Sequence, residues 1–176
     1  VGVGVDALLS NTTGNGNTSI GYTALNSNTS GIQNSALGRG ALYSNTSGGS
    51  NIAIGQDALN SNVSGSNNVA IGTSSLILNT ASNNVAVGFE AGFSSTSASG
   101  ITAIGYQALR TSTGAFNTAL GWSSLTANTT GTENTAVGYQ ALYTNTASGD
   151  NVAVGRNALK LSTGAGNTVI GEGGGS

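Results

Sequence analysis

A glycine preceded by a large aliphatic residue recurs along the whole chain at intervals of 16 or 17 residues. The residue before the glycine is always Val, Ile or Leu, so these positions form an apolar column. Regular self-similarity at a short, fixed period is typical of a repeat array. The eleven glycines are Gly4, Gly21, Gly38, Gly55, Gly72, Gly88, Gly105, Gly121, Gly138, Gly155 and Gly171.

Other columns keep the same spacing. Ala stands two residues before the glycine in eight repeats, and Leu stands four residues after it in nine of the first ten. Gly92 interrupts the Leu column, and we expect Phe93 beside it to fill the space. Asn stands four residues before the glycine in nine of the ten later repeats, with Ile101 as the exception. Thr stands eight residues after the glycine in nine of ten, and its replacement by Val63 suggests that shape matters there more than the hydroxyl.

The repeat predicts a β-solenoid. A unit of 16 or 17 residues is too short for a helix pair and lacks helical periodicity. Its three-residue apolar stretches, bounded by Gly, Asn, Ser and Thr, are typical of short strands. We predict an all-β fold, a parallel β-solenoid (β-roll) of about ten to eleven coils, with residues 1–171 as one repeat domain and 172–176 as a Gly-rich tail or linker. Coils stacked about 4.8 Å apart give a rod roughly 50 Å long.

The strands also indicate a contact surface. Neighbouring residues of a strand face opposite sides, so if the Val/Ile/Leu column fills the coil, the Ala column faces outward. A continuous outward strip of alanine allows another chain to approach closely, which favours a symmetric homo-oligomer. The alternative is a wide coil that encloses both columns.

Composition excludes several classes of function. Without His or Cys, the chain cannot form Ser-His-Asp or Cys-His catalytic groups, disulfides or the usual zinc sites. A net charge of −2 and 6% charged residues do not provide the basic surface that nucleic acids or anionic membranes attract. No apolar run reaches the roughly 20 residues that span a bilayer. We expect no enzyme activity, cofactor, metal, nucleic-acid partner or membrane insertion.

One pair of carboxylates has the spacing of a catalytic pair. Glu133 and Asp150 occupy the same position in adjacent repeats, which predicts a separation near the roughly 5 Å of a retaining glycosidase pair. Nothing else in the sequence indicates a cleft, so two solvated corner residues are the favoured interpretation. A weak cation contact is an intermediate alternative.

Aromatic residues directly follow the glycine in four consecutive repeats: Phe89, Tyr106, Trp122 and Tyr139. If this position points outward, the rings form a stripe of about 15 Å that could stack on sugars or contact a protein. We favour a simpler interpretation, in which the rings form a ladder that stabilises the coil stack or a seam between chains. The four residues are nevertheless the candidate ligand-binding site.

Two further patterns have structural explanations. The Thr column raises the possibility of ice binding, but ice-binding faces usually present two parallel Thr ranks, and only one is regular here. Asn-x-Ser/Thr triplets, such as the one that begins at Asn128, would accept glycans only in a eukaryotic secretory pathway. Their place at repeat corners explains them first.

The phrase Asn-x-Ala-(Val/Ile/Leu)-Gly-x-x-Ala-Leu, as in NTAVGYQAL at 134–142, resembles known fibre repeats. It is similar to the head repeats of YadA-like trimeric autotransporter adhesins and to the repeats of phage tail fibres. The resemblance extends from Val1 to Gly171 and implies a left-handed parallel β-roll assembled as a homotrimer. The unit here is longer than the adhesin unit and carries regular Ala-Leu and Asn-Thr elements.

The sequence thus predicts a structural or adhesive segment of an extracellular fibre, on a phage tail or a bacterial surface. It would act as a rigid shaft and would contact a host-surface receptor or glycan through the aromatic residues. Its expected main partners are other copies of the same chain, in a homotrimer or a filament. The alternatives are a subunit that polymerises end to end into a filament and an ice-binding solenoid.

Overall fold

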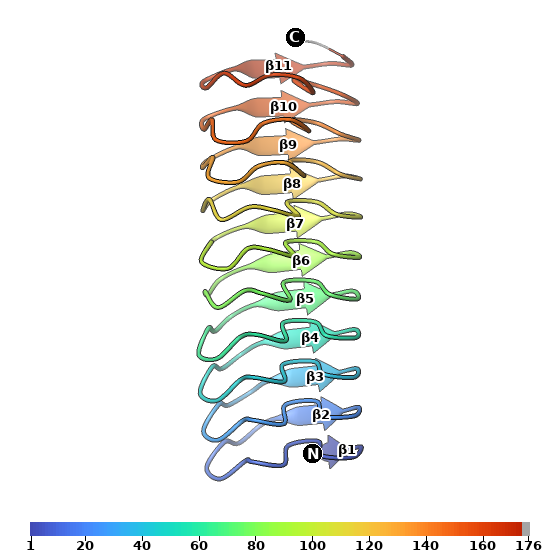
Figure 1. Cartoon of the computed structure of the whole chain (residues 1–176), viewed down its shortest axis with the longest axis vertical. Helices are drawn as coiled ribbons and strands as arrows, with labels where there is room; N and C mark the ends of the chain where they lie inside the picture. The colour runs from blue at the N-terminus through green and yellow to red at the C-terminus, as the bar shows by residue number, and fades with distance from the viewer. Residues whose placement is uncertain (174–176) are drawn as a thin grey trace.

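The protein, described here for residues 1–173 by a computed structural model, is a β-solenoid in which each repeat forms one coil. This part of the chain is all-β without a helix, so the predicted fold class is confirmed. The coils rise as one stack from the N-terminus to the C-terminus (Figure 1). The strands are β1 (Gly2–Val3), β2 (Thr18–Ile20), β3 (Ser35–Leu37), β4 (Ile52–Ile54), β5 (Val69–Ile71), β6 (Val85–Val87), β7 (Thr102–Ile104), β8 (Thr118–Leu120), β9 (Thr135–Val137), β10 (Val152–Val154) and β11 (Thr168–Ile170).

All eleven strands form one parallel sheet in chain order. Equivalent repeat positions lie opposite one another, so that Ala53 pairs with Ala36 on one side and with Ala70 on the other. The coil pattern continues to Gly173, whose N–H donates to the carbonyl of Arg156 at 3.0 Å. Residues 174–176 of the expected tail lie outside the described residues.

The strand side chains face the opposite way from our prediction. Ala53 and Ala70 have no exposed surface, whereas Ile52 and Ile54 on either side of Ala53 are 39% and 38% exposed. The prediction that the Val/Ile/Leu column fills the coil and the Ala column faces outward was wrong. A wide coil that encloses both columns is excluded as well, because the large aliphatic residues lie on the outside.

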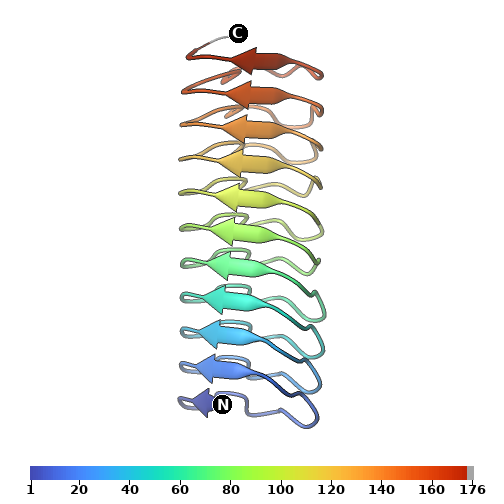
Figure 2. The same cartoon turned by 180° about the vertical axis from the view of Figure 1, so that it is seen from behind.

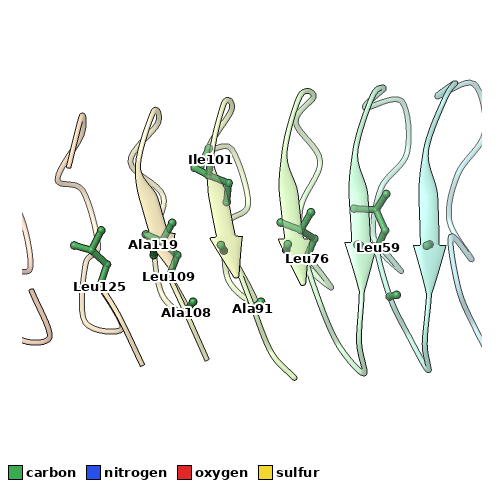
Figure 3. Close-up of a cluster of buried hydrophobic side chains, with 14 of the residues drawn as sticks. Leu59, Leu76, Ala91, Ile101, Ala108, Leu109, Ala119 and Leu125 are labelled. Atoms are coloured by element: carbon green, nitrogen blue, oxygen red, sulfur yellow. The ribbon is translucent and has the colours of Figure 1, made fainter. Parts of the chain in front are cut away.

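The narrow interior explains this reversal. The wall opposite the sheet contributes Ala58 and Leu59, both fully buried, and the equivalent pairs of the other coils. Figure 3 shows leucines of successive coils, among them Leu76 and Leu125, following one another through the inside of the stack. Protein interiors are close-packed. A leucine that enters the core from the wall opposite the sheet therefore leaves room on the sheet side only for the methyl group of an alanine.

The leucines reach the core from a left-handed backbone. Leu42 and Leu59 both have φ of 52°, a conformation that costs an L-residue roughly 1–2 kcal/mol. Two consecutive turns produce it: the N–H of Ala58 donates to the carbonyl of Gly55, and the N–H of Asn62 donates to the carbonyl of Leu59, both at 3.3 Å. The chain thereby reverses within eight residues of the strand end, which closes the coil.

The glycine that ends each strand is required by the neighbouring coil. Gly38 has φ of 136°, and a Cβ there would lie 2.5 Å from the carbonyl oxygen of Gly55 in the next coil. Any other side chain would therefore separate the coils at this corner. This close approach explains why the glycine is the most regular feature of the repeat.

Two columns of buried asparagine bond the coils together. In the predicted column, Asn34 Oδ1 accepts a hydrogen bond from the N–H of Asn51 at 3.0 Å, and Asn51 Nδ2 donates to the carbonyl of Gly65 at 2.9 Å. The second column, which we did not predict, stands seven residues after the repeat glycine. In it, Asn45 Nδ2 donates to Asn28 Oδ1 at 2.8 Å. The regular Asn or Ser at this position was the signal in the sequence.

The exceptions in the Leu and Asn columns compensate for each other. A Cβ on Gly92 would lie 2.8 Å from Leu76 Cδ2 and 3.5 Å from Ile101 Cδ1, so these two side chains fill the space of the missing leucine. Ile101 is only 1% exposed. Phe93 was the wrong substitute: it is half-buried at the surface, where the Arg110 guanidinium lies 5.2 Å from its ring centroid.

We predict that Asn51→Ala lowers the free energy of unfolding by at least about 3 kcal/mol, because several buried groups lose their hydrogen-bond partners. Denaturant unfolding followed by circular dichroism measures the effect. Gln56→Ala is the control, since it removes an exposed amide from the same coil and should change stability by less than about 0.5 kcal/mol. Equal stability of the two variants would contradict a structural role for the asparagine column.

A double-mutant cycle tests the compensation. Gly92→Leu alone should cost about 1–3 kcal/mol through overpacking against Leu76 and Ile101. Ile101→Asn alone should cost at least about 2 kcal/mol through a cavity. The double variant restores both columns, so it should be more stable than either single variant. Costs that simply add in the double variant would show that the two positions do not share one space.

Candidate functional site

The outward side of the sheet is an apolar face without a charged residue. We define the sheet face as the first and third residues of β2 to β11, which are only Val, Ile, Leu, Thr and Ser. Figure 2 shows the strands from this side, one above the other. Nine ladder steps and a width of about 10 Å give an area of roughly 400–500 Å², which is the scale of patches that mark interaction sites.

The four predicted aromatic residues lie together in one stack at the surface. Ring centroids are 5.5 Å apart from Phe89 to Tyr106, 5.5 Å from Tyr106 to Trp122 and 5.0 Å from Trp122 to Tyr139, with interplanar angles of 14°, 9° and 9°. This aromatic stack is the ring ladder that we favoured. Because the ring faces contact one another, they do not offer the open platform on which a sugar would stack.

Each ring sits in the tight turn that follows its strand. The N–H of Ala108 donates to the carbonyl of Gly105 at 3.4 Å across such a turn, with Tyr106 and Gln107 at its centre and φ of 53° at Gln107. In Figures 1 and 2 these turns lie at one narrow edge of the stack, beyond the strand arrowheads. The aromatic stack therefore lies beside the sheet face and not on it.

An ionic cluster lies beside the stack. Arg110 Nε donates to Glu90 Oε2 at 2.6 Å, and Gln107 Nε2 donates to the same oxygen at 2.9 Å. The hydrogen bond from Arg110 is the main reason that the pKa of Glu90 lies below its usual value, while partial burial opposes this shift. The charges of this cluster cancel each other. At the other end of the stack, the Arg156 guanidinium lies 5.9 Å from the ring centroid of Tyr139 and is paired with Glu172, so the surface around the stack is close to neutral.

Glu133 and Asp150 are exposed corner residues. Both have a left-handed backbone, with φ of 59° and 60°. Residues 1–173 contain no group of three or more side chains that could hold a metal ion. The arrangement favours the solvated interpretation of this pair.

The hydroxyls of the Thr column form hydrogen bonds within the protein. Thr29 Oγ1 donates to the carbonyl of Thr46 at 3.0 Å, and Thr129 Oγ1 donates to the carbonyl of Thr146 at 2.8 Å. The hydroxyl thus links neighbouring coils, a role that we had not predicted. Since these hydroxyls already donate to the backbone, the main basis for the ice-binding alternative is weakened.

The glycan-acceptor triplets begin at buried asparagines. Asn128 has no exposed surface, and its Nδ2 donates to the carbonyl of Gly131 at 2.9 Å. A glycan cannot be attached to this amide in the folded coil. The triplets therefore follow from the two asparagine columns, since that of Asn128 begins in the second column and that of Asn17 in the first.

Comparisons with protein-family models, curated proteins and solved structures found no match to the chain. The resemblance to adhesin and tail-fibre repeats therefore rests on the sequence phrase. Within residues 1–173, no helix is long and apolar enough to cross a membrane.

The aromatic stack predicts a measurable contribution to stability. Trp122→Thr, which introduces the residue that Thr73 supplies at the same position of another coil, removes two ring contacts and should cost about 1–3 kcal/mol. Urea unfolding followed by circular dichroism measures the loss. Gln56→Thr makes the corresponding change outside the stack and should have little effect. Unchanged stability in Trp122→Thr would show that the rings do not stabilise the coils.

Proposed function

We propose that this chain is a structural segment of an extracellular fibre, on a phage tail or a bacterial surface, and that three copies pack their sheet faces around a common axis. The observation that carries the proposal is the uncharged apolar sheet face, which continues from β2 to β11. The left-handed winding and the trimer implied by the resemblance belong to the same proposal. Its role is mechanical and includes no catalysis.

The aliphatic residues of the sheet face are exposed to solvent in the single chain, and packing against another chain would bury them. Ile20, Leu37 and Leu120 are 41%, 47% and 44% exposed in the single chain. Three sheet faces packed together would bury roughly 400–500 Å² of each chain, which is the scale of patches that mark interaction sites. The seam between copies would thus consist of the Val/Ile/Leu column and the first strand residues, in place of the alanine strip expected from the sequence.

The coil-to-coil bonds suit a shaft. Backbone hydrogen bonds run between successive coils, for example from the N–H of Gly55 to the carbonyl of Leu37 at 2.8 Å. The buried asparagines add side-chain bonds in the same direction, such as the 3.1 Å bond from Asn68 Nδ2 to Asn51 Oδ1. Since each coil contacts only its neighbours, a bend would have to break several of these bonds at once.

Light scattering across a concentration series tests the proposal, with Ile54→Lys as the variant and Val63→Lys as the matched control. Both positions are exposed and aliphatic, at 38% and 46%, but only Ile54 lies on the sheet face. We expect a stable trimer for the unchanged chain and for Val63→Lys. Ile54→Lys should shift the mass to that of a monomer, because burying an unpaired charge is costly.

The other outcomes decide between the alternatives. A monodisperse monomer of the unchanged chain would overturn the trimer and leave the sheet face without its proposed partner. A mass that keeps growing with concentration would instead favour end-to-end polymerisation. An equal response of the two Lys variants would show that the sheet face is not the contact.

A further inference from the structure

The aromatic stack presents the edges of its rings to solvent in a regular row. Phe89, Tyr106, Trp122 and Tyr139 are 43%, 41%, 44% and 43% exposed although their faces contact one another. Within residues 1–173, no hydrogen bond engages Tyr106 Oη, Trp122 Nε1 or Tyr139 Oη. Because these rings are exposed, the three groups remain available to a ligand at the surface.

The coil sets the spacing of the row. Successive centroids are 5.0 to 5.5 Å apart, one ring to each coil. A ligand that matched this row would be a linear polymer that offers one hydrogen-bonding group per similar step along the rod axis. An extended chain of β-linked hexopyranoses has a step of this size, and each sugar offers both hydroxyls and apolar C–H groups. The hydroxyls can bond to the polar ring atoms while the C–H groups contact the ring edges.

The charges around the aromatic stack indicate which class of polymer could bind there. Beside the stack, the charge of Glu90 is paired with that of Arg110, and the charge of Arg156, next to Tyr139, is paired with that of Glu172. Phosphate backbones require several free cations, and this edge of the rod does not offer them. A neutral polysaccharide fits better than a nucleic acid or a polyanionic glycan.

The fold itself does not require aromatic residues at this position. Arg39, Gln56 and Thr73 occupy it in three consecutive coils of the same sheet. Their side chains show how this edge is otherwise used: Arg39 Nη2 and Gln56 Nε2 both donate to Asp57 Oδ2, at 3.1 and 3.2 Å. The rings are thus a local feature of four coils, at an edge whose side chains can make polar contacts.

We propose that the aromatic stack binds one extended strand of a neutral β-linked polysaccharide, which lies along the rod axis with about one sugar per coil. Tyr106 Oη, Trp122 Nε1 and Tyr139 Oη donate hydrogen bonds to the sugar hydroxyls, and the ring edges contact the C–H groups. This inference goes beyond the shaft and does not depend on the number of chains, because the narrow edge and the sheet face are separate surfaces.

The test uses the whole chain with cellohexaose and chitohexaose as probes and maltohexaose as the α-linked comparison. Trp122 is the only tryptophan, so its fluorescence reports contact at the stack directly, and titration calorimetry gives the affinity. We expect at least one β-linked hexasaccharide to change the fluorescence and to bind at least tenfold more tightly than its disaccharide and than maltohexaose. The absence of binding by both β-linked probes would overturn the proposal, as would equal affinity for maltohexaose.

A matched pair of variants tests the hydroxyl contacts. Tyr106→Phe combined with Tyr139→Phe keeps the rings and removes two donors, and it should weaken binding at least fivefold with unchanged thermal stability. Tyr22→Phe removes a hydroxyl at the same repeat position outside the stack and should leave the affinity unchanged. Unaltered affinity in the double variant, or an equal loss in Tyr22→Phe, would overturn edge-on recognition. Because light scattering reads the oligomeric state separately, failure here is distinguishable from failure of the trimer.

Discussion

Hydrogen bonding between successive coils is the interaction on which the rest of the structure depends. A strand of three residues forms no stable element alone, so its backbone groups must be satisfied by the coils above and below. The same rule applies inside, where Asn51 bonds to Asn34 on one side and to Asn68 on the other. Since every coil must reproduce the path of its neighbour, the sequence repeats wherever the backbone approaches another coil closely.

Tight closure of the coil is obtained with strained residues. Leu25 and Leu76 have φ of 47° and 48°, a region that leucine rarely occupies. The conformation persists because it directs a large side chain into the core, where it contacts the alanines of the sheet. In the one coil that has Gly92 at this position, the side chains of Leu76 and Ile101 fill the missing volume. The core thus keeps the same filled volume in this coil, although side chains from other positions provide it.

The narrow core determines which residues lie on the outer surface. With only alanine beneath the strands, the large aliphatic residues are left on the outer surface, where they form the sheet face. The aromatic stack lies on the turns that follow the strands, beside the sheet face, and presents ring edges to solvent. The proposed assembly and the proposed ligand recognition would therefore use different sides of one rod, so that a shaft built from several copies would still expose the aromatic stack.

The sequence by itself determined the period, the glycine corner and the short strands, because each is a local requirement repeated in every coil. It also determined the grouping of Phe89, Tyr106, Trp122 and Tyr139, because a fixed period places the same position of successive coils side by side. It could not determine which side of the strand is inside. Strict alternation places Ala53 and Ile54 on opposite sides but gives no direction. The side that faces inward depends on the distance between the strand and the opposite wall of the coil. Leu59 sets this distance from a left-handed turn, which the sequence pattern does not predict. Only the closed coil shows that the space beneath the strand admits alanine and excludes isoleucine.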